Sequence, residues 1–376
     1  MFSIWEKQSF SAEPDLLVIG AGITGSFAAL HYKRRFPHHH VLLLERGQHP
    51  SGASVKNAGF ACFGSPSEIL ADMDAEGEQV AVARVAERWA GLCELRAELG
   101  DEHIGFEPSG GYEFYPENSA LYTRVADRFD ALNRALLPVF GRTPYAWASP
   151  AQRPFGAAGD QMAHTDLEGA VDSGALMRTL IHRIKGSGVE HRFGQSVVAL
   201  DNAGARAEVL LASGDKLLAK QVIVATNGYL RELLPHSDVV PARGQVLLTG
   251  PIPGLRLKGT FHMEEGYFYF RDHQGGVLLG GGRHLDKRGE TTTEDAVTPL
   301  VQQALERLLA DVILPGRSYT VAHRWSGVMG FRTSGKSPLI ERISPTVTVA
   351  AGLSGMGVAI GIRVARSAVD QLVKGS

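Results

Sequence analysis

The chain has 376 residues, of which 44% are hydrophobic and 21% are charged, and its formal net charge is −2. This balance excludes the basic surface of a nucleic-acid binder, and the length suits about two domains. With only Cys62 and Cys93, no apolar run long enough to cross a membrane and no secretory signal, we expect a cytoplasmic protein that has neither a disulfide scaffold nor a transmembrane segment.

The segment 15–45 reads as a strand, a glycine-rich turn, a helix and a second strand that ends on an acid. Gly20, Gly22 and Gly25 follow the first strand at the spacing of a dinucleotide-binding turn. The first permits a tight turn, the second lets a pyrophosphate approach, and the third lets the helix over 23–35 pack closely on the strand. The helix amino terminus then faces the phosphates. An ordinary βαβ turn without a ligand is the alternative.

Glu45 ends the second strand, 41–44, where its carboxylate can accept hydrogen bonds from a ribose diol. A carboxylate repels a 2′-phosphate, so this position argues against NADP. The nearby run of His38, His39 and His40 is interpreted as surface sequence and not as a metal site, because consecutive side chains of an extended loop do not converge on one ion.

Hydrophobic periodicity predicts the remaining elements. We expect, in chain order, a loop at 46–68, one or two helices at 69–99, a strand at 110–115, a helix from Ser119 to Leu137 before Pro138, turns at 145–170, a helix at 173–185, strands at 188–200, 205–211, 216–219 and 221–225, strands at 245–248, 259–263, 266–271 and 276–280, a helix at 293–309, and strands at 319–325 and 347–351 before a last helix that ends near 374. From Val239 onward, the strands predict a separate antiparallel layer.

Four further motifs accompany the fingerprint: GASVKNAG at 52–59, VIVATNG at 222–228, RGQ at 243–245, and HRWSGVMGF with AAGLSGMGVAIG near the end of the chain. With these motifs the sequence resembles the D-amino-acid oxidase and glycine oxidase (DAO) family of FAD-dependent oxidoreductases over nearly its whole length. The resemblance implies an α/β fold with a Rossmann-type FAD-binding domain and a second α+β substrate domain built on an antiparallel sheet. It also implies FAD, which the family can attach covalently through Cys or His. Because neither Cys62 nor Cys93 lies in a matching motif, we expect FAD to be bound noncovalently.

The resemblance assigns the cofactor contacts to positions in both halves of the chain. They are Gly20, Gly22, Ile23, Thr24, Gly25, Glu45, Arg46, Ala53, Ser54, Asn57, Ala58, Gly59, Val197, Val198, Ala225, Thr226, Gly228, Gly327, Gly352, Leu353, Ser354, Gly355, Met356 and Gly357. The final glycines open a helix whose N–H groups can face the flavin edge where negative charge develops. Lys56, which stands where relatives often have Arg, either meets phosphate or points to solvent.

The substrate pocket is assigned to Tyr267, Tyr269, His262 and Met329. Tyr267 fits a family tyrosine that binds a substrate carboxylate, and Tyr269 shares its face of a strand. His262 and His323 are candidates for proton transfer or for structural hydrogen bonds. The family arginine after the WxG motif is absent, because Met329 stands near that position. This departure favours an amine, or an amino acid bound by one of four other arginines, Arg243, Arg271, Arg324 or Arg332.

We therefore expect an FAD-binding domain from 1–68, 150–236 and 328–376, and a substrate domain from 69–149 and 237–327. The resemblance implies oxidation of the C–N bond of a small amine or amino acid by hydride transfer to flavin N5, followed by hydrolysis of the imine, with O2 or another electron acceptor. No metal and no nucleic acid are expected. An NAD-dependent dehydrogenase and a catalytically silent FAD-binding subunit are the alternatives.

Overall fold

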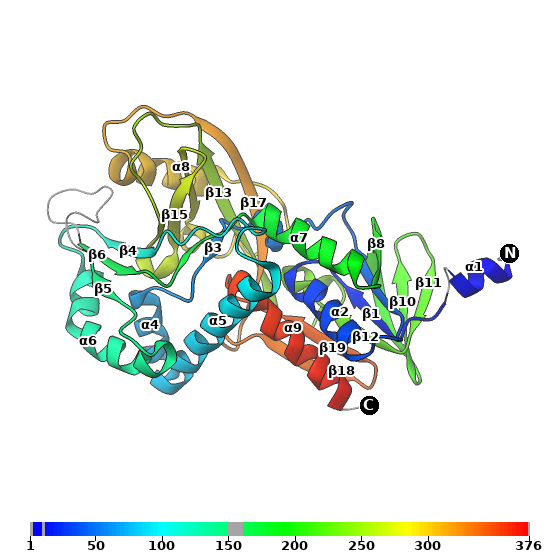
Figure 1. Ribbon diagram of the computed structural model, residues 1–376. Coiled ribbons are helices and arrows are strands. Elements are labelled where there is room, and N and C mark those ends of the chain that lie inside the picture. The colour runs from blue at the N-terminus through cyan, green and yellow to red at the C-terminus, as the bar shows by residue number, and fades with distance from the viewer. Residues whose placement is uncertain (1–2, 10–11, 149–160, 375–376) are drawn as a thin grey trace. The chain divides into compact units, whose positions relative to one another are not determined.

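The structure, a computed structural model, describes residues 3–9, 12–148 and 161–374 (Figure 1). Within them the chain divides into two compact units. Unit 1 comprises Met1–Val55, Gly174–Ala242 and Val328–Ser376, and unit 2 comprises Lys56–Ser173 and Arg243–Gly327. The sequence placed domain boundaries after residues 68, 149, 236 and 327, of which the one at 149 lies outside the described residues. Which unit binds the cofactor stays a prediction at this point.

Unit 1 is built on a six-stranded sheet within the described residues. Its strands in spatial order are β18 (Leu339–Ser344), β19 (Val347–Ala351), β12 (Gln221–Val224), β1 (Leu16–Ile19), β2 (Val41–Glu45) and β8 (Glu190–Phe193). All neighbours run parallel except β18, which is antiparallel to β19. The central strands are buried on both faces, which explains their continuous Val, Leu and Ile runs.

Two layers cover this sheet. On one side, Leu17, Leu42 and Val222 pack against Val209 of a three-stranded sheet formed by β9 (Val197–Ala203), β10 (Arg206–Leu211) and β11 (Lys216–Ala219). Helices α2 (Ile23–Arg35) and α9 (Gly357–Lys374) also contact the sheet and pack against each other. Helices α1 (Ile4–Ser9), α3 (Ala53–Lys56) and α7 (Ser173–Gly186) and the 3-10 helix η2 (Asn227–Glu232) complete the elements of this part of the chain.

Unit 2 contains most of an eight-stranded sheet within the described residues. Its order is β17 (Val321–Arg332), β13 (Val239–Thr249), β16 (Gly276–Gly281), β15 (Phe268–His273), β14 (Thr260–Met263), β4 (Gly111–Tyr115), β6 (Gln161–Thr165) and β5 (Ala146–Trp147). The pairs whose register is known are antiparallel except β14 with β4, which is parallel. The expected α/β fold with a second, mainly antiparallel sheet is confirmed. A short pair joins β3 (Phe60–Ala61) to β7 (Gly169–Ala170).

Helices cover two parts of unit 2. Helix α8 (Pro299–Leu308) and the π-helical turn η5 (Leu309–Ile313) bury Leu305 and Leu309 in one cluster with Phe261, Phe270 and Leu279 of the sheet. Helices α4 (Pro66–Glu76), α5 (Glu78–Leu99) and α6 (Ala120–Phe140) form a second cluster. The short turns η3 (Glu264–Gly266) and η4 (Arg283–Asp286) flank β15 and β16.

Helix α6 corrects one predicted boundary, because it passes through Pro138 and ends at Phe140. A proline in the last turn removes only one backbone hydrogen bond. The extra turn lets Phe140 pack 4.7 Å from Phe63 and 5.5 Å from Trp89, measured between ring centroids. Tertiary packing therefore outweighs the local signal.

The boundaries of several other predicted elements were also wrong. The strand expected at 188–200 is two strands, β8 and β9, and the loop expected at 46–68 contains α3 and β3 and the start of α4. The helix expected from 293 begins at Pro299, where proline suits the first helical position. Strand β17 runs to Arg332, β18 was not expected, and β5 and β6 lie within the segment read as turns.

Candidate active site

The glycine turn after β1 is a cradle set by backbone atoms. Gly20 has φ +100°, and a Cβ atom on Gly25 would lie 1.9 Å from the carbonyl oxygen of Gly20. A Cβ atom on Gly22 would lie 2.9 Å from Ser54 Oγ, and that hydroxyl accepts a hydrogen bond of 3.0 Å from the N–H of Ile23. No larger residue fits at the three glycines without displacing backbone or Ser54, as expected for a turn that admits a ligand closely.

Glu45 ends β2 with its carboxylate buried. Its Oε2 accepts a hydrogen bond of 3.0 Å from Ala21 N, and its Oε1 accepts one of 3.1 Å from Gly47 N. A carboxylate has about four acceptor positions, so capacity remains for ribose hydroxyls. The next residue, Arg46, lies 3.7 Å above the ring centroid of Tyr229. The backbone N–H of Gln195, just before β9, bonds to the carbonyl of Glu45, and Val198 nearby is 48% exposed.

A second glycine turn lies between β19 and α9, and the structure joins it to the TNG motif. Asn227 Oδ1 accepts hydrogen bonds from the N–H groups of Gly352 (3.0 Å) and Leu353 (3.4 Å). Ser354 has φ +48°, and its N–H donates to the carbonyl of Gly330 at 3.0 Å. Two motifs that are 125 residues apart in the sequence therefore form one rigid turn.

The cradle also contains polar atoms that protein groups do not satisfy. Within the described residues, the hydroxyl oxygens of Thr24 and Thr226 are buried without a hydrogen-bond partner. A buried hydroxyl without a partner is costly. Thr226 follows β12 directly, at the carboxyl end of a parallel strand, which is the usual ligand side of such a sheet. These features fit a dinucleotide cofactor.

The 52–59 loop has fewer features of this kind. Asn57 Oδ1 accepts from Gly59 N at 2.9 Å and from Ser173 Oγ at 2.6 Å, while Gly59 has φ +73°. Lys56 Nζ forms an ion pair with Asp295, so its side chain has a protein partner that the sequence did not indicate. A Cβ atom on Gly327 would lie 2.8 Å from Lys56 Cβ. Contacts of Asn57, Ala58 and Gly59 with the cofactor stay a prediction.

Unit 2 presents a row of register-paired residues on one face of its sheet. Glu113, His262, Tyr269, Gly280 and Val246 are neighbours on successive strands, and paired residues point to the same face. The opposite face holds the α8 cluster. We call its polar members, Glu113, His262 and Tyr269, the polar strip; beyond Tyr269 the same face is apolar, because Tyr269 packs with Val246 and Phe60 in one hydrophobic cluster.

His262 and Tyr269 are the central polar members of this row. His262 is 8% exposed, and its Nε2 has no partner within the described residues. Burial lowers the pKa of His262 to about 4 and raises the pKa of Tyr269 to about 12, so both are neutral near pH 7. The ring of Phe60 lies 5.2 Å from that of His262 and 5.6 Å from that of Tyr269.

The other two predicted pocket residues lie elsewhere. Tyr267 precedes β15 with φ −69° and ψ −24°, so the strand parity that paired it with Tyr269 was wrong. Its ring packs 4.6 Å from that of His284. Met329 belongs to unit 1, where its Sδ would lie 3.7 Å from a Cβ atom on Gly355. His323, the second histidine candidate, is exposed.

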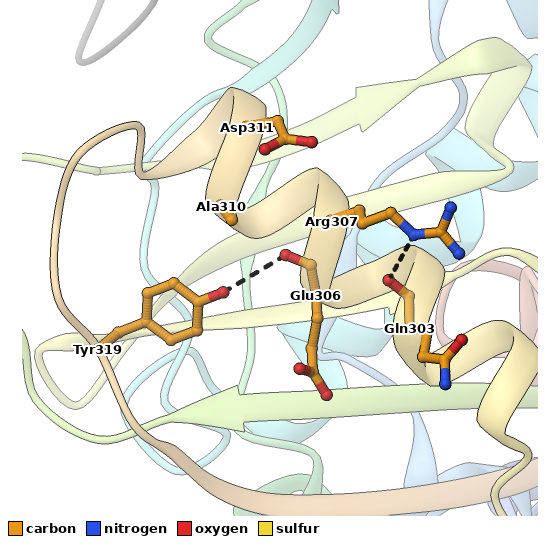
Figure 2. Close-up of a pocket in the computed structure, with 6 residues that line it drawn as sticks. All are labelled: Gln303, Glu306, Arg307, Ala310, Asp311 and Tyr319. Carbon is orange, nitrogen blue, oxygen red and sulfur yellow. Dashed lines mark hydrogen bonds between the residues drawn. The ribbon is translucent and has the colours of Figure 1, made fainter.

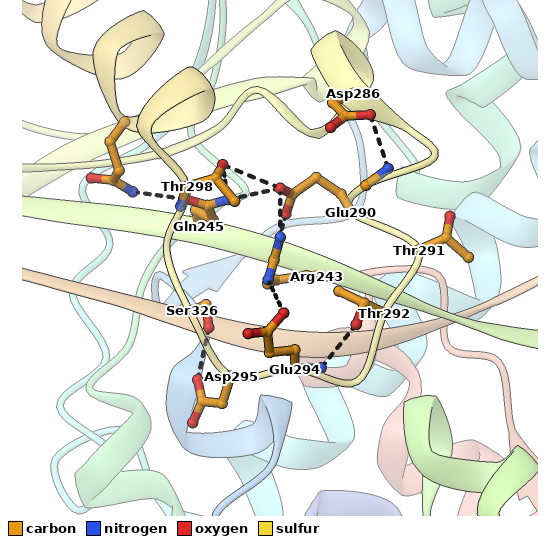
Figure 3. A network of polar contacts seen from close by, with 12 residues as sticks. Arg243, Gln245, Asp286, Glu290, Thr291, Thr292, Glu294, Asp295, Thr298 and Ser326 are labelled. Carbon is orange, nitrogen blue, oxygen red and sulfur yellow. Dashed lines mark hydrogen bonds and ion pairs between the residues drawn. The ribbon is translucent and has the colours of Figure 1, made fainter.

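All four candidate arginines have protein partners. Arg243 donates to both carboxylate oxygens of Glu290, at 2.8 and 3.0 Å, in the network of Figure 3. Arg271 donates to the carbonyls of Gly59 and Val171. The remaining two bind side chains, since Arg324 contacts Gln302 and Glu306 and Arg332 contacts Asp238.

The RGQ motif thereby acquires a structural role. Gln245 Nε2 donates to Glu290 at 2.9 Å, and Gln245 Oε1 accepts from Thr298 N at 2.9 Å (Figure 3). Together with Arg243 it ties both ends of the segment 290–298 to β13. Within that segment, Asp295 accepts from Ser326 Oγ at 2.7 Å.

Two buried acids were missed because no motif marks them. Glu113 accepts from Ser65 Oγ and Ser67 N, at 3.1 and 2.8 Å. Glu168 accepts from Phe63 N and Gly64 N, and burial raises its pKa to about 8 despite these bonds. The only sign of them in the sequence was an acidic residue within a segment that long-range strand pairing buries.

Other features do not add to the site. A surface hollow of about 460 Å³ lies along α8 and η5, lined by residues such as Glu306, Arg307 and Tyr319, none of which the sequence had assigned to the site (Figure 2). Cys62 is buried, and burial raises the pKa of its thiol. His39 contacts Tyr32, whereas His40 contacts Glu190.

Two searches of the described residues gave negative results. None of the helices in 3–9, 12–148 or 161–374 combines the length and the apolar character that crossing a bilayer requires. In the same residues, no three His, Cys, Asp or Glu side chains gather into a group suited to a metal ion.

Comparison with known proteins gives a family match and similar folds. The family model described as DAO, FAD dependent oxidoreductase, matches residues 15–371. Iminodiacetate oxidase from Chelativorans sp. BNC1 is 21% identical with a TM-score of 0.74, covering 96% of this chain and 95% of that one. Glycine oxidase from Geobacillus kaustophilus is 19% identical with a TM-score of 0.76, covering 96% and 95%.

A third similar structure broadens the range of activities found on this fold. L-Proline dehydrogenase from P. horikoshii is 17% identical with a TM-score of 0.76, covering 98% of this chain and 95% of the other. At these identities the structures agree in fold, and the fold is the extent of the likeness.

Proposed function

Because the chain belongs to the DAO family of FAD-dependent oxidoreductases, we propose that it oxidises the C–N bond of a small amine or amino acid. When bound, FAD would supply a two-electron acceptor for the hydride that leaves the carbon beside the nitrogen. The nitrogen loses a proton, and water then hydrolyses the imine to a carbonyl compound and an amine. The nicotinamide alternative is wrong, since the family uses FAD.

The two glycine turns proposed for the cofactor lie in unit 1. The turn of Gly20, Gly22 and Gly25 would admit the pyrophosphate, Glu45 would accept from the ribose, and the Asn227-bound turn at Gly352 would present backbone N–H groups to the flavin. The buried hydroxyl of Thr226, which has no hydrogen-bond partner within the described residues, supports this assignment.

The observation that carries the substrate chemistry is the neutral pair of His262 and Tyr269. A carbon gives up hydride when its nitrogen has a free lone pair, so the amine must be bound as the neutral base. Within the described residues, His262 Nε2 is buried without a hydrogen-bond partner, and its pKa is lowered to about 4. The neutral ring is therefore able to accept a hydrogen bond from an N–H group of the substrate, and it does not confront the substrate with a positive charge.

Anaerobic bleaching of the bound flavin tests the proposal. The purified protein should be yellow, and one or more of glycine, sarcosine, L-proline, iminodiacetate and simple alkylamines should bleach its flavin bands, with dithionite as the control for reducible flavin. The variant H262N should slow bleaching roughly 5- to 150-fold, as loss of a buried hydrogen bond of about 1–3 kcal/mol does, while H323N, at the exposed histidine, should not. A yellow protein that dithionite bleaches but no amine does would favour the silent FAD-binding subunit.

A further inference from the structure

Arg271 lies one row away from His262 and Tyr269, on the same face of the unit 2 sheet. It pairs with Thr260, two positions along the strands from the pair of His262 and Tyr269, and side chains two positions apart on a strand share a face. The residue is only 5% exposed, although arginine is rarely buried without partners. Burying a guanidinium is costly unless hydrogen bonds compensate it.

The guanidinium joins two segments that lie over this face. Arg271 Nη1 donates to the carbonyl oxygens of Gly59 and Val171, at 2.8 and 3.0 Å, and its Nε donates to the carbonyl of Asp272 at 3.1 Å. Within the described residues, these backbone carbonyls are the acceptors that the guanidinium reaches. Hydrogen bonds from a charged donor are roughly twice as strong as neutral ones. Arg271 is therefore a strong link between Gly59 and Val171.

Gly59 allows the arginine to approach closely. Its φ is +73°, and a Cβ atom at this position would lie 2.8 Å from Arg271 Nη1 and 2.3 Å from Val171 O. A side chain on residue 59 would thus displace the guanidinium or the neighbouring backbone, in a conformation that already favours glycine. The residue type at 59 and the position of Arg271 depend on each other.

The two linked residues flank the short β3–β7 pair. Gly59 precedes Phe60 and Val171 follows Ala170, and Phe60 and Ala170 are partners in the antiparallel register. The N–H of Val171 also donates to Gly59 O at 2.8 Å. Arg271 therefore holds the end of the β3–β7 pair at which Phe60 lies, on the sheet face that carries the polar strip.

Phe60 is the residue through which this link reaches the polar strip. Its ring packs edge to face on the rings of His262 and Tyr269, with interplanar angles of 76° and 75°. His262 is 8% exposed, and an aromatic ring in contact with the imidazole excludes water from that side. The position of Phe60 therefore affects the hydration of His262.

Several charged and titratable groups surround His262. On the elements packed around it they are Glu68 of α4, Arg88 of α5, Glu113 of β4, Tyr269 of β15, and Glu264 and Glu265 of η3. Glu68 favours the protonated imidazole and Arg88 opposes it, but burial is the largest cause and lowers the pKa of His262 to about 4. Hydrating the ring while these charges stay in place should therefore raise this pKa.

We propose that Arg271 is a positioning residue of the proposed reaction: by holding the β3–β7 pair on the sheet, it keeps Phe60 against His262, so that the imidazole meets the substrate nitrogen as a neutral acceptor. The inference rests on the proposed function, because His262 is the group that faces the amine in that reaction. Arg271 acts through Gly59 and Phe60, with its donors bound to the backbone.

The titration of His262 in the FAD-bound protein tests this role. Isotope-labelled histidine is followed by NMR in wild type, R271M, R271K and F60A, and the signal of His262 is identified by its absence from H262N. In R271M the pKa of His262 should rise from about 4 toward its ordinary value of 6.5, because water reaches the ring. F60A should raise the pKa in the same direction, although it removes no charge.

The double variant R271M/F60A separates the link through Phe60 from the charge of Arg271. If Arg271 acts through Phe60, the pKa of His262 in the double variant should equal that in F60A. R271K keeps the charge but loses the planar fork, so its pKa for His262 should lie between those of wild type and R271M. R243M is the control, because it removes another buried arginine of unit 2, whose partner is Glu290, and should leave the pKa of His262 unchanged.

The pH dependence of anaerobic flavin reduction gives a second readout. With sarcosine or L-proline as the donor, the rate of R271M relative to wild type should be roughly three- to tenfold lower at about pH 5 than at about pH 8, because a larger fraction of His262 is then protonated in the variant. The relative rate cancels the ionisation of the substrate amine, which both proteins share. A general folding defect would lower it equally at both pH values.

The outcomes distinguish the two proposals. If amines or amino acids reduce wild type but the titration of His262 is the same in R271M, or the rises in R271M and F60A add, the positioning role is wrong and the proposed function stands. If R271M and F60A raise the pKa as expected, yet dithionite bleaches wild type and no amine or amino acid does, the proposed function fails. If R271M does not fold, R271K and F60A decide, since the positioning role requires both to raise the pKa of His262.

Discussion

The glycine turns of unit 1 and the sheet face of unit 2 are built by opposite means. In unit 1 the backbone sets the space, since a Cβ atom on Gly25 would overlap the carbonyl of Gly20 and Asn227 holds two N–H groups of the second turn. In unit 2, side chains brought together by strand register make the surface, and burial sets the pKa of His262. A site built from backbone atoms has no titrating group and does not tolerate substitution. A site built from side chains contains titrating groups and tolerates substitution.

The largest effect should come from the backbone cradle. Gly25→Ala places a Cβ atom 1.9 Å from Gly20 O, and the forced shift should both destabilise the fold by roughly 3 kcal/mol or more and abolish stoichiometric flavin binding. Flavin absorbance per chain and thermal unfolding measure the two effects. Gly186→Ala is the control, because no atom lies within 4 Å of its Cβ position. Normal flavin content in the Gly25 variant would place the cofactor elsewhere.

The buried ion pair of unit 2 should give the next largest effect. Arg243→Met leaves the carboxylate of Glu290 buried, with the two side chains 4% and 1% exposed, and should cost roughly 3–5 kcal/mol of unfolding free energy. Chemical denaturation measures it. Arg142→Met breaks a pair that is 52% and 63% exposed and should cost less than about 1 kcal/mol.

The double variant R243M/E290L tests whether the loss in the Arg243 variant comes from the unpaired charge of Glu290. Because removing both charges avoids an unpaired buried ion, it should be less destabilised than the sum of the two single variants. Additive losses would mean that the segment 290–298 is held by its other contacts.

The difference between the regions also explains what the sequence could predict. The fingerprint, β1, α2 and β2 follow from local glycine spacing and apolar periodicity, and the predicted helix over 23–35 is confirmed. Asn227 and Gly352 were each assigned to the cofactor site, yet nothing local shows that one amide oxygen joins them.

Unit 2 resisted prediction because its polar strip depends on long-range pairing. The prediction that Tyr267 and Tyr269 share one face of a strand was wrong, because Gly266, with a φ of +81°, belongs to the turn before β15. Glu113 and His262 become neighbours through a parallel pairing of strands some 150 residues apart. The glycines at the end of β16 were the one local signal, since Gly280 and Gly281 within a strand indicate a close approach of other groups.

The pH dependence of stability should next distinguish the titrating side chains of unit 2 from the backbone-built turns of unit 1. The folded-state pKa of Glu168, about 8, lies above its ordinary value of 4.5, so the folded state binds the proton more tightly. The contribution of Glu168 to stability should therefore fall as pH rises from about 4.5 to 8, by at most about 1.4 kcal/mol per pH unit, and be constant outside that window. His262, whose pKa is lowered to about 4, contributes the opposite slope between about 4 and 6.5, so the effect of Glu168 is obtained as the difference between the denaturation curves of wild type and Glu168→Gln. An unchanged slope would mean that Glu168 is ionised in the folded protein.

The smallest effect should come from Lys56, which stands where the backbone-built and side-chain-built regions meet in the sequence. Its pair with Asp295 has side chains 24% and 52% exposed, so Lys56→Met should cost less than about 1 kcal/mol. Flavin content should stay unchanged, because the ammonium is committed to Asp295. Lys258→Met, which breaks a pair 70% and 16% exposed, is the matched control. A loss of flavin from the Lys56 variant, at equal unfolding free energy, would instead show that Lys56 leaves Asp295 for a phosphate of the cofactor.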